Sequence, residues 1–133
     1  MAATRFTELR VWKLASELHA KICDVTRRAA AQQDREFCDQ IRAASASVSA
    51  NIAEGFARYS HRDFARFLAI ARGSLAETQN HLQVGLSRNQ IARDTFQQLW
   101  ELSTRTMAAT TGLLMYLRTH PDPPARRSGT RRT

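Results

Sequence analysis

The chain has 133 residues, 20 basic and 12 acidic, so that its net charge is +8 and its pI is near 10.9. Apolar residues make up 43% of it, enough for one globular core and too few for a membrane protein. All three prolines lie in residues 121–133, and residues 1–120 contain only four glycines. Because turns depend on these two residue types, the distribution disfavours β-sandwich and alternating β/α folds and favours a few long helices.

No targeting or membrane-spanning segment is visible. Residues 1–10 already carry Arg5, Glu8 and Arg10 and lack the apolar centre of a secretory signal. The longest apolar run, Leu113–Leu117, is far shorter than the ~18 residues that span a bilayer. Two cysteines do not make a disulfide framework. We therefore expect a cytoplasmic protein with no membrane partner.

The first half of the chain contains two stripes of apolar residues that alternate in spacing between three and four, which predicts helices with one buried face. The first stripe runs from Val11 to Ala29, and the second runs from Phe37 to Phe56. Asp34 precedes the second stripe by three residues and is the expected N-cap of that helix.

The second half repeats the pattern. One stripe runs from Phe64 to Leu82, preceded by Ser60 as an expected N-cap and followed by Asn89 as an expected left-handed stop. The last stripe runs from Phe96 to Leu117 and ends before Pro121. Short connections between long helices predict an all-α, antiparallel up-down-up-down four-helix bundle over residues 1–120. Residues 121–133 lack large apolar side chains and are expected to form a disordered basic tail.

Some helices carry a second apolar line beside the first. In the last helix it repeats every seven residues, and the first helix adds a tryptophan. Such lines indicate either one wide core face or a subunit interface. The candidate interface residues are Trp12, Trp100, Met107 and Leu114.

Catalytic chemistry has little support in the sequence. The four histidines are scattered, no E-x-x-H pair could build a di-iron centre, and no glycine-rich phosphate loop is present. We expect neither an enzyme nor a metal or other cofactor. Cys23 and Cys38 lie at similar distances from the first turn, which allows a disulfide or two separate small thiols.

The densest group of polar residues lies in Asn51–Ser60 (NIAEGFARYS). Glu54 and Arg58 have the favourable acid-first spacing of four, and Gly55 inside a helix indicates close approach of another helix. Related polar positions flank this segment, and the whole set forms either a structural layer that determines helix register or a ligand or nucleic-acid site. Its members are Gln40, Arg42, Asn51, Glu54, Gly55, Ser60, Arg72 and Glu77.

Arginine outnumbers lysine 18 to 2. Guanidinium groups suit phosphate recognition, although a basic surface can also be merely solvated. One cluster surrounds the second turn beside Tyr59, and another lies in the tail. The candidate nucleic-acid contacts are Arg58, Arg62, Arg66, Arg126, Arg127, Arg131 and Arg132.

Four motifs in this order resemble one bacterial family. They are F-x-x-L-x-V-W-x-x-A at Phe6–Ala15, Q-I-R-A-A at Gln40–Ala44, the Asn51–Ser60 segment, and F-L-x-I-A-R-G-S-L-A-E at Phe67–Glu77. The family consists of four-helix-bundle proteins encoded in intervening sequences of bacterial 23S ribosomal RNA genes. The match runs from Phe6 to Leu117 and excludes the tail.

The resemblance implies a bundle that assembles into a ring-shaped homopentamer and whose biochemical role is largely undefined. A related branch is the accessory protein of reverse transcriptases in diversity-generating retroelements, in which a basic pentamer binds nucleic acid and the transcriptase. Two positions depart from the family pattern: Ser49 stands where proline is frequent, and Asn89-Gln90 replaces a glycine-tyrosine turn.

Together the residues and the resemblance predict a non-enzymatic homo-oligomer that presents a basic surface to RNA or DNA. The alternative is a protein-interaction scaffold or an accessory subunit, for example of a reverse transcriptase, with no nucleic-acid role of its own. A small-molecule site near Asn51 and Glu54 is a third hypothesis.

Overall fold

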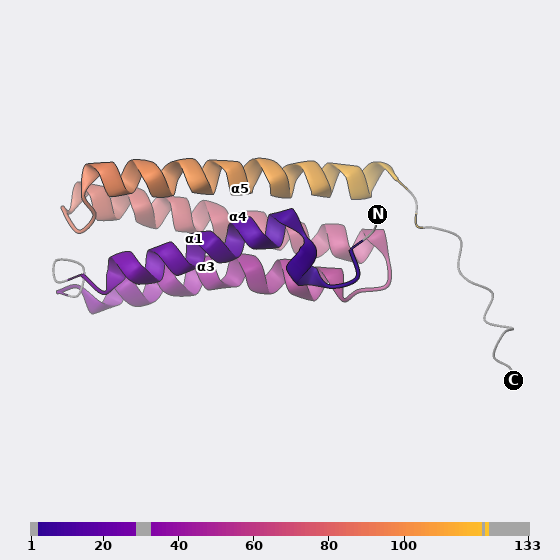
Figure 1. The fold of residues 1–133 in the computed structure, drawn as a ribbon, viewed down its shortest axis with the longest axis horizontal. Helices are drawn as coiled ribbons and strands as arrows, with labels where there is room; N and C mark the ends of the chain where they lie inside the picture. Colours follow the sequence, from indigo (N-terminus) through magenta and orange to yellow (C-terminus); the bar gives the residue numbers. More distant parts are fainter. Residues whose placement is uncertain (1–2, 29–32, 121, 123–133) are drawn as a thin grey trace, which may run out of the picture.

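The computed structural model describes residues 3–28, 33–120 and 122. In this part of the chain a short 3-10 turn precedes four long helices, and no strand is present. The elements are η1 (Phe6–Glu8), α1 (Arg10–Thr26), α3 (Arg35–Phe56), α4 (His61–Ser87) and α5 (Arg93–Thr119). The fold is therefore an all-α helical bundle, as the apolar periodicity predicted (Figure 1). The expected basic tail lies outside the described residues except for Asp122.

Each described helix packs against two others. α1 contacts α3 and α5, and α4 likewise contacts α3 and α5, so that α1 lies diagonally across from α4. The turn between α3 and α4 lies at the end of the molecule where α5 finishes, and the turn between α4 and α5 lies at the opposite end (Figure 1). This arrangement places the beginning of α4 beside the end of α5.

The core is formed by the predicted stripes. Its largest side chains are less than 2% exposed and come from all four helices: Leu18, Ile22, Ile41, Val48, Ile52, Leu68, Leu75, Leu82 and Leu114. Each helix buries one face against its two neighbours, which is why a spacing of three and four residues predicted the helices correctly.

Hydroxyl side chains also enter the core. Thr106 and Thr110 are fully buried, and each donates a hydrogen bond of 2.7 Å to the carbonyl oxygen four residues earlier. Thr78 does the same towards Ser74. Because the helix itself accepts these protons, the polar members of the stripes are buried without an unpaired donor.

The helix ends match the predicted signals. The Asp34 carboxylate accepts from the Phe37 amide at 3.0 Å, and the Ser60 hydroxyl accepts from the Asp63 amide at 3.1 Å. Asn89 has a φ of 59° after the end of α4, as expected for a left-handed stop. These three predictions are confirmed.

Gly55 lies where α3 and α4 approach closely. A Cβ atom at this position would lie 2.8 Å from Phe67 Cβ and 2.9 Å from Phe64 Cδ1. The close helix approach inferred from a glycine inside a helix is confirmed, because a methyl group at this site would overlap both phenylalanines.

The two cysteines are not joined in a disulfide. Cys23 is half-buried and Cys38 is buried. The interpretation as two separate thiols is therefore the one that the structure supports.

Candidate nucleic-acid interface

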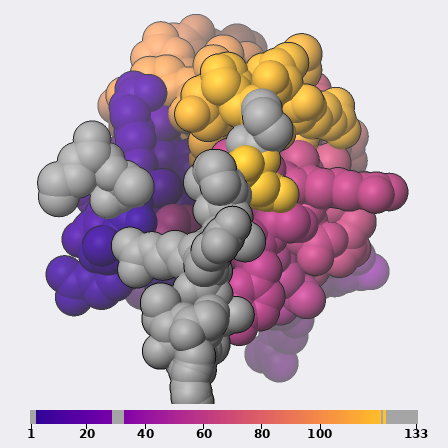
Figure 2. Space-filling model, turned by 90° about the vertical axis from the view of Figure 1, so that its right-hand side faces the viewer, coloured from indigo at the N-terminus to yellow at the C-terminus, as the bar shows by residue number. Residues whose placement is uncertain are grey.

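The candidate surface lies at one end of the bundle, where the turn between α3 and α4 meets the end of α5. Ser60 caps α4, and the next residue, His61, has its Nδ1 atom 3.0 Å from the His120 carbonyl oxygen. Seen from this end, the last turn of α5 and the first turns of α4 lie side by side (Figure 2). Residues almost 60 positions apart in sequence are thereby brought together.

The three predicted arginines of the second turn are all exposed at this end. The Arg58 and Arg66 guanidinium carbons lie 4.7 and 4.6 Å from the centre of the Phe67 ring. This distance allows cation–π attraction, which is weak at an exposed site but restricts where both charged groups lie. Phe67 therefore brings the charge of Arg58 and that of Arg66 to one place on the surface.

Carboxylates reduce the positive charge of this cluster. Arg58 pairs with Glu54 at 2.9 Å, as the spacing predicted, and Arg66 pairs with Asp63 at 3.8 Å. These side chains are about half exposed, so the pairs add little to stability. Each carboxylate nevertheless partly neutralises its arginine, which weakens the attraction of that arginine for a phosphate.

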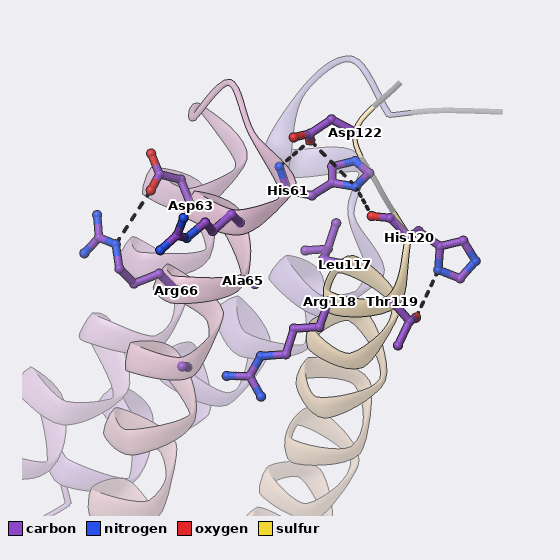
Figure 3. Close-up of a pocket in the computed structure, with 11 residues that line it drawn as sticks. His61, Asp63, Ala65, Arg66, Leu117, Arg118, Thr119, His120 and Asp122 are labelled. Carbon is purple, nitrogen blue, oxygen red and sulfur yellow. Dashed lines mark hydrogen bonds and ion pairs between the residues drawn. The ribbon is translucent and has the colours of Figure 1, made fainter. Parts of the chain in front are cut away.

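A groove of about 960 Å³ separates the beginning of α4 from the end of α5. Arg62 and Arg66 line it from α4, and Arg118 lines it from α5 (Figure 3). In the described part of the chain, neither Arg62 nor Arg118 forms an ion pair. These two guanidinium groups are thus available to an external anion, unlike those of Arg58 and Arg66.

An acidic group of the chain itself already lies at the rim of this groove. The Asp122 carboxylate accepts a hydrogen bond from the His61 amide, and it lies 3.8 Å from His61 Nδ1 (Figure 3). A carboxylate at this position is favoured because the first amides of a helix are unpaired and carry partial positive charge. The same feature suits the binding of a phosphate oxygen.

Tyr59 lies two residues before His61, which lines the groove, and its ring is uncovered. Its side chain is completely exposed in the turn between α3 and α4, next to Arg58. An exposed ring beside a guanidinium group offers a surface on which an unpaired base can stack.

The contribution of α5 to this surface was not predicted from the sequence. Arg118 and His120 follow the last apolar stripe and carry no motif, so that nothing local marks them. Counting along an up-down bundle would have found them, because the first residues of α4 and the last residues of α5 share one end. The tail arginines Arg126, Arg127, Arg131 and Arg132 lie outside the described residues.

The polar positions around the Asn51–Ser60 segment do not form one continuous layer. Asn51 donates to the Ser47 carbonyl and hydroxyl oxygens at 2.8 and 3.0 Å, and Ser47 Oγ lies 2.9 Å from Ser74 Oγ on α4. Arg42 donates from Nε to the Thr26 hydroxyl at 2.7 Å and so links α3 to α1. These two contacts connect helices, as a register-determining layer would.

The remaining members of that set serve other purposes. Gln40 donates to Glu36 at 3.4 Å on an exposed face, and Glu77 lies 3.6 Å from His81 on its own helix. Arg72 is exposed and forms no ion pair within the described residues. Gly55 and Ser60 have the packing and capping roles described above. The fold therefore does not bring all these residues together into a single ligand site.

Three of the four candidate interface residues are half-buried. Trp12 packs edge-on against Phe6 with ring centres 5.3 Å apart, and Trp100 stacks on Phe96 at 5.5 Å. Met107 packs against the core from the same line of α5. Each of these side chains retains an exposed part on a single chain.

The placement of Leu114 on an outer face is corrected by the structure. Leu114 is 1% exposed and belongs to the core of its own chain. The physical reason is the helical period: a strict seven-residue repeat drifts by ~20° per heptad in a straight α-helix. The line that starts at Trp100 on the surface therefore reaches the core by Leu114.

Within the described residues, no group of three histidine, cysteine or acidic side chains is arranged to hold a metal ion. None of the described helices combines the length and the hydropathy that are needed to cross a bilayer. The geometry at the end of the bundle is that of a partly neutralised cationic groove with an exposed aromatic ring.

Comparisons with known proteins agree with the resemblance of the motifs. The family described as 23S rRNA-intervening sequence protein matches residues 7–112. A crystal structure from Bacteroides thetaiotaomicron, described as a protein of unknown function from the S23 ribosomal protein family, has the same fold with a TM-score of 0.72. It is 22% identical, and the alignment covers 78% of this chain and 97% of that one. Among curated proteins no match was found. The chain belongs to the family of 23S rRNA-intervening sequence proteins.

Proposed function

We propose that this protein is a non-enzymatic homo-oligomer that binds the phosphate backbone of RNA or DNA through the groove between α4 and α5. Its helices follow up-down-up-down order, and the assembly is the ring-shaped homopentamer that the family resemblance implies. Each protomer then contributes one cationic groove, and several copies in a ring add their fields. The proposed compartment is the cytoplasm.

The observation that carries the proposal is the convergence of arginines at one end of the bundle. The turn and two helices contribute Arg58, Arg62, Arg66 and Arg118. Of these four arginines, Arg58 and Arg66 pair with carboxylates of the described residues, and Arg62 and Arg118 do not. Arg62 lines the groove from α4 and Arg118 lines it from α5. Such an arrangement recognises phosphate with little dependence on base sequence.

The first test removes the unpaired charges. The double variant Arg62→Ala/Arg118→Ala is expected to bind RNA more weakly, and its salt slope is expected to fall by about 1 for each phosphate that a site no longer neutralises. The measurement is RNA affinity by fluorescence anisotropy over a series of salt concentrations. Affinity should decrease for different RNA sequences to a similar degree.

The matched control is Arg72→Ala/Arg105→Ala. Both residues are exposed, one on α4 and one on α5, and neither lines the groove. The control removes the same formal charge from the same two helices. Equal reductions of affinity and slope in the two double variants would show that net charge alone, and not the groove, attracts RNA.

The second candidate function is a scaffold or accessory subunit for another protein, such as a reverse transcriptase. The observation in its favour is the group of exposed apolar side chains on α4 and α5: Ile70 is 43% exposed, and Met115 and Tyr116 are each 51% exposed. Exposed apolar surface commonly marks protein contacts. A chain that assembles but does not bind RNA at low salt would favour this function over the first.

A further inference from the structure

A second group of reactive side chains lies away from the cationic groove, between α1 and α3. Cys23 and His19 lie one helical turn apart on α1 and are both half-buried. The Cys23 Sγ atom is 3.6 Å from His19 Nε2, within hydrogen-bonding distance for sulfur. The nucleic-acid proposal gives neither side chain a role.

Ser45 on α3 contacts the Nδ1 atom of the His19 ring, and this contact favours one tautomer of the neutral ring. The single hydroxyl proton of Ser45 is directed to carbonyl oxygens of its own helix, that of Ile41 at 2.9 Å and that of Arg42 at 3.2 Å. The Ser45 oxygen therefore acts as an acceptor towards His19 Nδ1, which lies 2.9 Å away. With the hydrogen on Nδ1, the lone pair of the neutral ring lies on Nε2, the ring nitrogen nearer to the thiol: Cys23 Sγ is 3.6 Å from Nε2 and 4.0 Å from Nδ1.

The surroundings favour the neutral ring. Burial is the main cause that lowers the pKa of His19 below its ordinary value, and the positive charge of Arg42 lowers it further. Arg42 is held nearby by the hydrogen bond of 2.7 Å from its Nε to Thr26 Oγ1. At neutral pH the imidazole is thus unprotonated and able to accept a proton from Cys23.

We propose that Cys23 is a reactive thiol and a site of oxidation by hydrogen peroxide, with His19 as its general base and Ser45 as the residue that positions the base. In the reaction the thiol proton passes to His19 Nε2 while the sulfur attacks one oxygen of the peroxide. The S–O bond forms as the O–O bond breaks, and the leaving hydroxide takes the proton from Nε2. The thiol is oxidised to a sulfenic acid, and the peroxide is reduced to water.

Cys38 provides a contrast within the same chain. It is 4% exposed, and its Sγ atom donates to the Thr26 carbonyl oxygen at 3.7 Å. Burial raises the pKa of the Cys38 thiol. Since the thiolate is the nucleophile, Cys38 is expected to react slowly in the folded protein.

The experiment compares the two cysteines in the full chain. Folded and urea-unfolded protein are treated with hydrogen peroxide plus a sulfenic-acid probe, and in parallel with iodoacetamide, and each cysteine is quantified by peptide mass spectrometry. Cys23 is expected to react about tenfold faster in the folded chain than in the unfolded chain, because general-base assistance commonly exceeds that factor. Cys38 is expected to react more slowly in the folded chain than in the unfolded one.

Two variants test the roles of the neighbours. His19→Gln should reduce the rate at Cys23 to that of the unfolded chain, and Ser45→Ala should lower it and change the pH profile of the reaction. Ser49→Ala is the matched control, because the Ser49 hydroxyl also bonds back to its own helix, to the Ala46 carbonyl oxygen. Circular dichroism shows whether each variant is folded.

The proposal is overturned if folded Cys23 reacts no faster than unfolded Cys23, whether because assembly covers it or because the base is ineffective. It is also overturned if folded His19→Gln retains the wild-type rate and pH profile. Neither result bears on RNA binding, since these residues lie outside the groove.

Discussion

At Gly55 the absence of a side chain determines how closely two helices approach. Phe64 and Phe67 of α4 occupy the space that a Cβ atom would need. Gly73 is exposed on α4, and among the described residues beyond the adjoining backbone of its own helix no atom lies within 4 Å of a Cβ added there. The same substitution by alanine thus meets a crowded site at Gly55 and an open one at Gly73.

Gly55→Ala is expected to lower the free energy of unfolding by about 1–3 kcal/mol, because overpacking forces the phenylalanines to move. Gly73→Ala should raise it by about 0.5–1 kcal/mol, because alanine loses less backbone entropy in a helix. Urea denaturation of both variants measures the difference. Equal effects at the two positions would contradict the close contact at Gly55.

At the scale of one element, the beginning of α3 depends on Asp34. Besides capping Phe37, its carboxylate accepts from Gln90 Nε2 at 2.9 Å and lies 3.5 Å from Arg88. The Phe37 amide is the main cause that lowers the pKa of Asp34, followed by the Gln90 side chain. One carboxylate thus caps α3 and connects it to the turn between α4 and α5.

The lowered pKa predicts an acid-dependent loss of stability. A carboxyl whose folded pKa lies below its ordinary value of 3.8 stabilises the fold above that value, and the contribution is lost as the pH falls through the folded pKa. Asp34→Asn should therefore be less stable than wild type at neutral pH, and the difference should shrink on acidification. Thermal unfolding from about pH 7 down to about pH 2 covers this range and checks the prediction. Asp39→Asn, which removes an exposed acid of the same helix, is the control for the loss of one negative charge.

At the scale of the whole molecule, the heptad line of α5 has an outer part and a buried part. Leu114 packs inside the chain, whereas Met107, one heptad earlier, is half-buried. The proposed assembly uses the outer part, which contains Trp100 and Met107. Substitution of the buried Leu114 should therefore lower the stability of the fold. Substitution of the half-buried Met107 should instead change the molar mass in solution.

Met107→Glu is expected to reduce the molar mass measured by light scattering while leaving the helix content unchanged, since a charge is costly to bury at an interface. Leu114→Ala should instead lower the free energy of unfolding by about 2–5 kcal/mol, as truncation of a core leucine does. A wild-type chain that is monomeric at all concentrations would refute the proposed oligomer.

The helices and their ends were predictable because their causes are local. Apolar spacing along Phe37–Phe56, the cap at Asp34 and the stop at Asn89 each depend on a few neighbouring residues and on helix geometry. The family was recognisable from its motifs, and the family model matches residues 7–112 of the chain. The position of Leu114 was wrong because a heptad pattern alone does not reveal the angular drift of a straight helix.

The sequence by itself thus determined the helical bundle, its core stripes and its family. Only the tertiary structure decided which side chains from distant parts of the chain meet: it placed Arg118 across from Arg62 and set Ser45 against His19. The reason is that helix formation follows from interactions over three or four residues. The electrostatic surroundings of an arginine or a histidine depend instead on which helix faces pack together. The residues next to it in the sequence do not show which faces these are.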